Sequence, residues 1–577
     1  MRKLRAIVLM TGLSALMVAP AGAFTDPTNS DIAPYTALSG APMDAIKQAM
    51  ETTHLGLSLR VDPKSKSIAG IARYTVQALS ELNAVEFDLD PRFKITSISI
   101  DGVELGLSEW RNDGGKLIID LPNAVGEAGY VDVQISYGGQ PRIAPNAPWD
   151  GGFVWAKTPA GQDWVATAVQ GTGCDLFWPC LDHPTKRVGM LDLSVTVPAP
   201  LVVAANGRLS GVEHNGEWST YRWQAKYPND YGVSLQIGPY ETVSTDYKSR
   251  HGNSYPITFW HLPGHHDQAT RLVGEMEDYL DFFESKIGPY PFGNEKVGVV
   301  ETPHKGMEHQ TINAYGNKFV LSAEGYDELM QHEFSHEYFA NQLTGKRVAD
   351  LWLHEGLGTY MQPLYLDWKD GRMAYNAKMS DLRKRIVSKV PVAPAVEVQS
   401  TLYDDREKGW GGDIYYKGAW IAHTLRYLVG DEAFFRSLTR LVYGRATPKP
   451  GNFGHQVAST DDFQRIVEEE YGSELDWFFN TYLREAELPK LSVTRSGSRL
   501  SLVWDTVSED TFAMPVEIRI EGDVQTVAMP EGHATVTLPF VDAHVTVDPY
   551  SKVLRENEAI AAWRSQEAAD RQKKQAK

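Results

Sequence analysis

Two histidines and a glutamate with the spacing of a metal site stand near the middle of the chain. Residues 331–340 read QHEFSHEYFA, so His332 and His336 are four positions apart and Glu333 directly follows the first. On an α-helix such positions lie on one face, so both imidazoles can direct a nitrogen at a single ion. Glu333 projects beside them, where a carboxylate can take a proton from an activated water. The pattern by itself also fits an ordinary helix with two partly buried histidines.

A candidate third ligand follows after a suitable interval. Glu355, in the segment DLWLHEGLGTY, comes nineteen positions after His336. That interval suits a helix, a turn and a second, antiparallel helix that presents its carboxylate to the same ion. Two neutral imidazoles and one carboxylate leave Zn2+ with net positive charge and an open coordination position, as in catalytic zinc sites. We therefore expect one zinc ion per chain.

Two further segments complete a set of motifs. Glu308 lies upstream in KGMEHQTINAYG, and Tyr415 lies downstream in DIYYKGAW. In this order the chain resembles the aminopeptidase N family of gluzincin metallopeptidases. That family shows Gly-x-Met-Glu-Asn, then His-Glu-x-x-His, then a glutamate ligand and finally Tyr-x-Lys-Gly. The joint match is far more specific than any one of its elements.

The resemblance implies a role for each matching position. His332, His336 and Glu355 would bind the zinc ion. Glu333 would be the general base that hydrolysis requires, and Tyr415 would donate a hydrogen bond to the oxyanion of the tetrahedral intermediate. The implied activity is zinc-dependent hydrolysis of the N-terminal peptide bond of peptide substrates.

The resemblance also implies a site for the free amino terminus of the substrate. Glu308, which follows Gly306 and Met307, would pair with the α-ammonium group that an internal peptide bond lacks. The segment AVQGTGCDLFWPCLDHPTKR is similar to the one that supplies a substrate-binding glutamine in the family, which implies Gln170. His309 stands where the family usually has asparagine, a departure that concerns substrate preference rather than reaction type.

Three alternatives remain open from the residues alone. An endopeptidase is disfavoured by Glu308, and an epoxide hydrolase like the leukotriene hydrolases is disfavoured by the β-rich segment after the catalytic core. A catalytically silent peptide-binding protein is disfavoured because Glu333 and Tyr415 are both in place. The sequence indicates neither the preferred N-terminal side chain nor the oligomeric state.

Hydrophobic periodicity divides the chain into regions. Alternating segments such as HLGLSLRV predict strands, a helical period then dominates, and alternation returns near the C-terminus. Together with the resemblance, this predicts a multidomain α+β protein. We expect an N-terminal, saddle-like β domain at 24–262, a mostly helical thermolysin-like zinc catalytic domain at 263–487, a small β-sandwich at 488–555 and a charged tail at 556–577.

Composition and the first residues predict an exported protein. The formal net charge of the 577 residues is -18, which disfavours nucleic acid and anionic lipid as partners. Residues 1–23 combine a basic start, a short apolar run and small residues before a cleavage point, as in a secretory signal peptide. We expect a periplasmic or secreted protein without membrane insertion after signal cleavage. In such a compartment Cys174 and Cys180 can form a disulfide, and two buried thiols remain the alternative.

Overall fold

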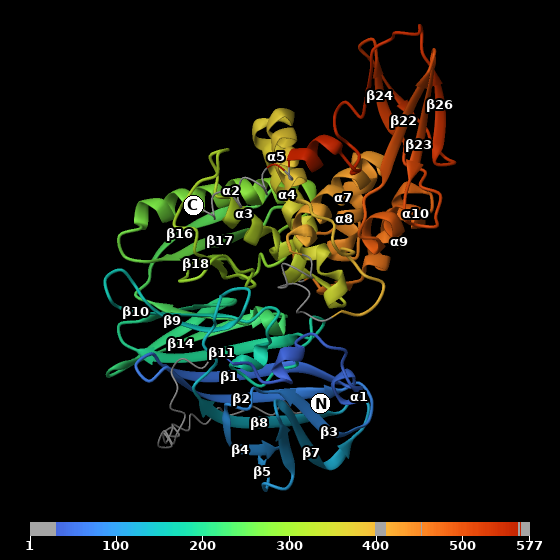
Figure 1. Cartoon of the computed structure of the whole chain (residues 1–577). Coiled ribbons are helices and arrows are strands. Elements are labelled where there is room, and N and C mark those ends of the chain that lie inside the picture. The colour runs from blue at the N-terminus through green and yellow to red at the C-terminus, as the bar shows by residue number, and fades with distance from the viewer. Residues whose placement is uncertain (1–30, 399–410, 452, 564–565, 567–577) are drawn as a thin grey trace, which may run out of the picture.

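The computed structural model describes residues 31–398, 411–451, 453–563 and 566 (Figure 1). The signal peptide predicted at 1–23 and most of the tail predicted at 556–577 lie outside the described residues. Strands coloured blue to teal are followed by a helical region in green to orange and by a last group of strands in red-orange. This arrangement confirms the predicted multidomain α+β class.

An eight-stranded sheet dominates the N-terminal region. Its strand order is β13-β14-β11-β1-β2-β8-β4-β5, and the β1–β11 pair is parallel. The alternating residues Leu55, Leu57, Leu59 and Val61 of β1 are all buried, as the two-residue period predicts. The strands are β1 (Met50–Asp62), β2 (Ser67–Ala78), β4 (Lys94–Ile100), β5 (Val103–Glu104), β8 (Tyr130–Gly139), β11 (Val188–Pro198), β13 (Arg208–Asn215) and β14 (Trp218–Lys226).

Two smaller sheets share the apolar core of the large one. The first has the order β12-β15-β10-β9 and the second the order β3-β7-β6. Their strands are β3 (Leu82–Asp88), β6 (Trp110–Asp113), β7 (Lys116–Val125), β9 (Gly152–Lys157), β10 (Asp163–Ala168), β12 (Val202–Ala205) and β15 (Leu235–Gly238). Short helical segments are η1 (Thr36–Leu38), α1 (Ala45–Gln48), η2 (Cys174–Leu176) and η3 (Asp230–Gly232). Cys174 and Cys180 form a disulfide beside η2, so the two cysteines are not free thiols.

The helical region is built around a sheet of order β16-β17-β18-β19, on which α2 packs. The apolar stripe of α2 is buried, including Leu272, Met276 and Phe283. The strands are β16 (Glu241–Lys248), β17 (Ser254–His261), β18 (Val297–Glu301) and β19 (Asn313–Tyr315), so this sheet uses strands from both sides of residue 262. Within the described residues, no helix is both long and apolar enough to cross a bilayer.

The remaining elements of this region are mostly helices. The helices are α2 (His266–Lys286), α3 (Glu328–Ser335), α4 (Trp352–Asp370), α5 (Arg372–Arg385), α7 (Asp413–Val429), α8 (Asp431–Tyr443), α9 (Thr460–Tyr471) and α10 (Asp476–Phe479). Shorter turns are η4 (Glu337–Gln342), η5 (Val348–Asp350) and η6 (Asn480–Arg484), and β20 (Leu343–Gly345) pairs with β21 (Gln456–Ala458).

Two three-stranded sheets form the C-terminal region, with orders β22-β23-β26 and β25-β24-β27. Their strands are β22 (Lys490–Ser496), β23 (Arg499–Asp505), β24 (Val516–Ile520), β25 (Asp523–Val527), β26 (His533–Thr537) and β27 (Val545–Val547). Buried residues of these sheets belong to the same apolar cluster as the helices. The segment after β27 also contacts α7, because Leu554 N donates to Thr424 Oγ1 over 3.0 Å. The C-terminal sheets and the helical region therefore share one core.

A pair of glycines sets the distance between α4 and α7. A Cβ atom on Gly418 would lie 2.8 Å from the Cα of Gly356, closer than real Cβ contacts come. Only glycine at this crossing lets the two helices approach so closely. Glu355 neighbours one of these glycines, and Tyr415 lies three residues before the other. The crossing therefore positions two of the residues that the sequence analysis singled out.

We predict that Gly418→Ala destabilises the protein by about 1–3 kcal/mol, because the added methyl group overpacks the crossing. Gly274→Ala in α2 is the matched control, since a Cβ there would meet no neighbouring atom within 4 Å. The control substitution should stabilise its helix by about 0.5–1 kcal/mol. Urea unfolding followed by circular dichroism measures both changes. A Gly418→Ala protein as stable as the parent would contradict this account of the crossing.

Candidate metal centre and active site

The two histidines stand at the end of α3. Asp327 caps the start of this helix and accepts a hydrogen bond from Met330 N over 3.1 Å. The sequence pattern predicted that both histidines lie within one helix. The helix instead ends at Ser335, so His336 is its C-cap residue. The two residues nevertheless keep one helical turn of separation, because the cap retains helical backbone angles.

The chain bends sharply after His336, and the bend fixes the orientation of its ring. Phe339 and Ala340 have non-helical backbone angles within η4. The carbonyl oxygen of Phe339 lies 3.1 Å from His336 Nδ1. Since a carbonyl can only accept a hydrogen bond, this contact places the proton on Nδ1 and directs the lone pair of Nε2 away from it. That is the tautomer that a metal ligand requires.

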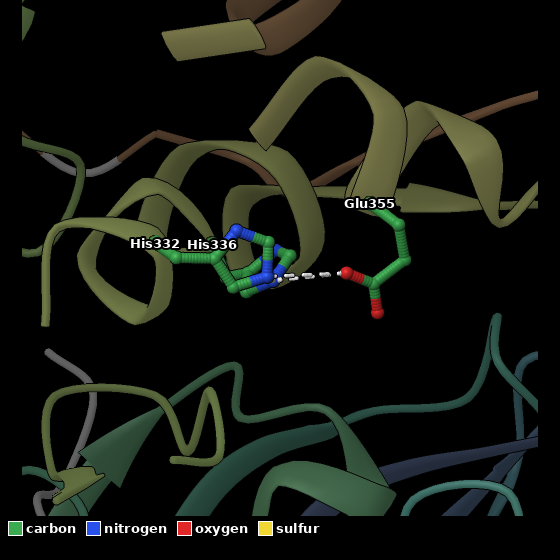
Figure 2. A group of neighbouring side chains, drawn as sticks. All are labelled: His332, His336 and Glu355. Atoms are coloured by element: carbon green, nitrogen blue, oxygen red, sulfur yellow. Dashed lines mark hydrogen bonds and ion pairs between the residues drawn. The ribbon is translucent and has the colours of Figure 1, made fainter. Parts of the chain in front are cut away.

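Three ligand atoms converge beside α3 (Figure 2). The Nε2 atoms of His332 and His336 lie 3.1 Å apart. Oε2 of Glu355, on the first turn of α4, lies 3.3 Å from the first nitrogen and 3.4 Å from the second. Two imidazole nitrogens and a carboxylate oxygen are donors that zinc accepts. The structure thus brings together the three residues that the sequence analysis expected to bind zinc.

The charges of this cluster favour a cation. Burial alone would lower the pKa of His336, but the adjacent Glu355 carboxylate raises that pKa to about 10. Burial alone would raise the pKa of Glu355, but His336 and His332 hold it well below its usual range. In both cases the protein favours one positive charge next to the carboxylate. A divalent metal ion bound between these three side chains would supply that positive charge.

Glu333 packs against a glycine that leaves room for its carboxylate. A Cβ atom on Gly306 would lie 2.1 Å from Glu333 Oε1, so any side chain there would displace the Glu333 carboxylate. Burial raises the pKa of Glu333 well above its usual range. Glu333, Glu308 and His336 also present ligand atoms within 4.8 Å of one another. A carboxylate with increased proton affinity at this distance from the metal cluster can act as a general base.

Glu308 is held by residues from two regions of the chain. Gln170 Nε2 donates a hydrogen bond to Glu308 Oε1, and the Tyr231 hydroxyl lies 3.5 Å from the same oxygen. Asn341 Nδ2 donates to the Glu308 backbone carbonyl over 3.0 Å, and Ala314 N donates to that of Met307 over 2.9 Å. Burial raises the pKa of Glu308 to about 7. The sequence resemblance indicated Gln170. It did not indicate Tyr231, because the surrounding segment YPNDYGVSL matches none of the motifs described above.

The neighbouring histidines make contacts that do not reach the three-ligand cluster. His309 Nδ1 lies 3.4 Å from Gln236 Nε2 on β15, and burial lowers the pKa of its ring to about 3. His354 Nε2 accepts a hydrogen bond from Gly345 N over 2.8 Å. Each ring therefore has a packing role in this part of the fold.

Of the two adjacent tyrosines on α7, Tyr415 is the one beside the cluster. Its ring centroid lies 5.9 Å from that of His332. Tyr416 instead contacts Arg385, whose guanidinium lies 5.3 Å from its ring centroid. The helix thus separates a side chain near the metal ligands from one that packs elsewhere.

The comparisons with known proteins agree with this geometry. The model of the peptidase M1 N-terminal domain matches residues 51–229, and that of the peptidase family M1 domain matches residues 272–482. The chain belongs to peptidase family M1. This is the aminopeptidase N family that the sequence motifs predicted, and its zinc requirement agrees with the donor set at His332, His336 and Glu355.

Two similar proteins differ from this chain in length and sequence. A probable aminopeptidase 1 of Sulfurisphaera tokodaii is 21% identical over 80% of this chain and 60% of its own length. A leucyl aminopeptidase of Saccharolobus solfataricus is 23% identical over 63% of this chain and 47% of its own. This chain thus spans about half to three fifths of those two relatives.

Solved structures support the fold of this M1 family member. An M1 zinc metallopeptidase from Deinococcus radiodurans has a TM-score of 0.63 and 21% identity, covering 76% of this chain and 95% of that protein. A mutant two-domain M1 zinc metallopeptidase bound to L-tryptophan has a TM-score of 0.66 and 21% identity, covering 78% of this chain and 98% of that protein. At this identity, the likeness shows a common fold.

We predict that Glu355→Gln lowers the affinity for zinc more than about tenfold, because it removes the charged donor of the cluster. Glu308→Gln is the matched control, since it changes a nearby buried carboxylate outside the three-ligand set. Competition with a chromogenic chelator measures both affinities. A larger loss in Glu308→Gln than in Glu355→Gln would indicate instead that the ion is bound between Glu308, Glu333 and His336.

Proposed function

We propose that this chain is a zinc-dependent aminopeptidase that hydrolyses the N-terminal peptide bond of peptides. The observation that carries the proposal is the position of Glu308, a buried carboxylate within 4.8 Å of Glu333 and His336. A carboxylate there can pair with the α-ammonium of a substrate whose first peptide bond lies at the metal cluster. The names of the two relatives described above support the same activity.

The residues of the chain divide the chemistry among them. In the proposed mechanism His332, His336 and Glu355 hold zinc, which when bound supplies a Lewis acid that activates water and polarises the carbonyl. Glu333 takes the proton from the attacking water and returns it to the leaving amine. Tyr415 donates a hydrogen bond to the carbonyl oxygen as negative charge develops on it.

A second group of residues binds the amino terminus of the substrate. Glu308 pairs with the α-ammonium, and Gln170 adds a polar contact beside it. Gly306 and Met307 line the path of the substrate, and the missing side chain at Gly306 leaves Glu333 free to reach the water. An internal peptide bond brings no positive charge to Glu308, so binding of such a bond would leave the buried carboxylate without a cationic partner.

Export through a signal peptide at residues 1–23 is part of the same proposal. The disulfide between Cys174 and Cys180 is compatible with an oxidising compartment such as the periplasm or the exterior of the cell. Peptides that reach that compartment would be the substrates.

We predict that the purified protein releases the fluorophore from aminoacyl amides but not from their N-acetylated counterparts. A zinc chelator should abolish the release, and Glu333→Gln should lower kcat by more than about 100-fold, because the general base is lost. A fluorogenic assay with both substrate sets measures this. Cleavage of the acetylated compounds would indicate an endopeptidase, and zinc binding without any cleavage would indicate a peptide-binding protein.

We predict that Tyr415→Phe lowers kcat by about 100- to 1000-fold with little change in zinc content, because one oxyanion donor is lost. Tyr416→Phe is the matched control, and it should retain activity close to that of the parent. Steady-state kinetics on one aminoacyl amide compare the two variants. The assignment of Tyr415 is wrong if the two substitutions have the opposite ranking.

A further inference from the structure

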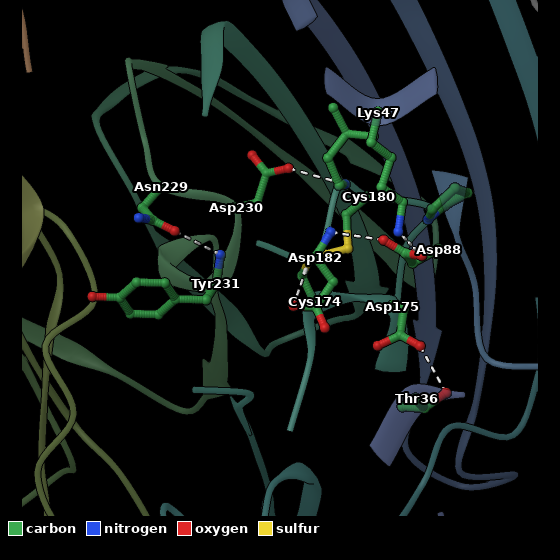
Figure 3. The surroundings of a disulfide bond; sticks show 12 residues. Thr36, Lys47, Asp88, Cys174, Asp175, Cys180, Asp182, Asn229, Asp230 and Tyr231 are labelled. Atoms are coloured by element: carbon green, nitrogen blue, oxygen red, sulfur yellow. Dashed lines mark hydrogen bonds and ion pairs between the residues drawn. A yellow bond between two sulfur atoms is a disulfide. The ribbon is translucent and has the colours of Figure 1, made fainter. Parts of the chain in front are cut away.

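Tyr231 reaches Glu308 from the N-terminal region. Its hydroxyl lies 3.5 Å from Glu308 Oε1, the oxygen that also accepts a hydrogen bond from Gln170. Figure 3 shows the Tyr231 ring extending away from the disulfide, toward the olive ribbon of the helical region. The orientation of this carboxylate thus depends on two side chains that belong to the opposite region of the molecule.

The turn that carries Tyr231 is tied to the segment after the disulfide. Asn229 Oδ1 accepts a hydrogen bond from Tyr231 N over 3.2 Å, and Asn229 Nδ2 donates to Pro184 O over 2.9 Å. Asp230 Oδ2 accepts from Leu181 N, directly after Cys180, over 3.1 Å. The backbone around Tyr231 is therefore held by the segment that directly follows the disulfide loop (Figure 3).

The segment that precedes the disulfide loop carries Gln170. Gly173 N donates to Val169 O over 2.8 Å, so the turn that contains Gln170 closes immediately before Cys174. Cys180 exchanges two backbone hydrogen bonds with Asp88 of β3, of 3.0 Å and 2.7 Å. The disulfide thus joins two segments covalently. The first follows the turn that contains Gln170, and the second is hydrogen-bonded to the turn that carries Tyr231.

We propose that Tyr231 is a positioning residue for the amine-binding carboxylate, and that the disulfide keeps Tyr231 and Gln170 aligned on it. This inference rests on the proposed aminopeptidase function. Gln170 and Tyr231 both contact Oε1 of Glu308. Among the described contacts, this leaves Oε2 to bind the substrate ammonium. A carboxylate held in one orientation binds an ammonium group without the entropy loss of ordering itself.

The test compares Tyr231→Phe with Tyr227→Phe, the same chemical change four residues earlier on a half-exposed ring. Tyr231→Phe should raise KM for free-amine aminoacyl amides about tenfold, as expected when a hydrogen bond to a charged group is lost. Its kcat should change less than about twofold, because Glu333 and the metal ligands are untouched. Tyr227→Phe should match the parent in both constants.

The disulfide is tested by replacing Cys174 and Cys180 together with serine. This double variant should raise KM in the same direction, and adding Tyr231→Phe to it should give less than the product of the separate effects. Zinc content and the midpoint of thermal unfolding show whether each variant is folded. If the serine variant does not fold, the comparison of Tyr231 with Tyr227 still decides the role of Tyr231.

The outcomes separate this inference from the function on which it rests. An inactive parent protein would contradict the aminopeptidase proposal itself. An active parent with an unchanged KM in Tyr231→Phe would overturn only the positioning role, as would a loss confined to kcat. A folded serine variant with the KM of the parent would overturn the part assigned to the disulfide.

Discussion

The central constraint in this protein is the convergence of two imidazole nitrogens and one carboxylate oxygen within 3.4 Å of one another. Such a buried group is costly unless a proton or a cation is shared among its members. The surrounding fold meets this requirement with separate elements. The end of α3 supplies both histidines, the first turn of α4 supplies Glu355, and the bend at Phe339 fixes the tautomer of His336.

Close backbone contacts make this convergence possible. Gly356 and Gly418 let α4 and α7 cross near the cluster, and Gly306 leaves space for the Glu333 carboxylate. At the crossing of α4 and α7 a displacement is transmitted directly, because no flexible side chain lies between the two glycines. The geometry of the site therefore depends on positions that carry no functional group.

Local patterns in the sequence were sufficient to predict the fold class, the family and the groups to look for. The period of two in β1 and the stripe of α2 are local signals, and both residue sets are buried in the structure. The spacing from His332 to Glu355 is also local, because it crosses only one turn between helices. The contact of Tyr231 with Glu308 joins residues 77 positions apart across two regions, so no periodicity could indicate it. Strand β16 pairs with its sequence neighbour β17. The pairing of β17 with β18 is not local, because helix α2 lies between these two strands in the sequence.

The shared core of the helical and C-terminal regions couples the stability of the last sheets to the helix α7. Thr424 of α7 accepts a hydrogen bond from Leu554 N, and Tyr482 donates one to Leu554 O over 2.6 Å. Leu554 lies 130 positions after Thr424, so α7 gains this packing only when the C-terminal region has joined the helical region. The same helix carries Tyr415, whose ring lies beside that of His332. Loss of the contacts between these two regions would therefore reach a side chain that lies beside the metal ligands, although the C-terminal strands carry none of those ligands.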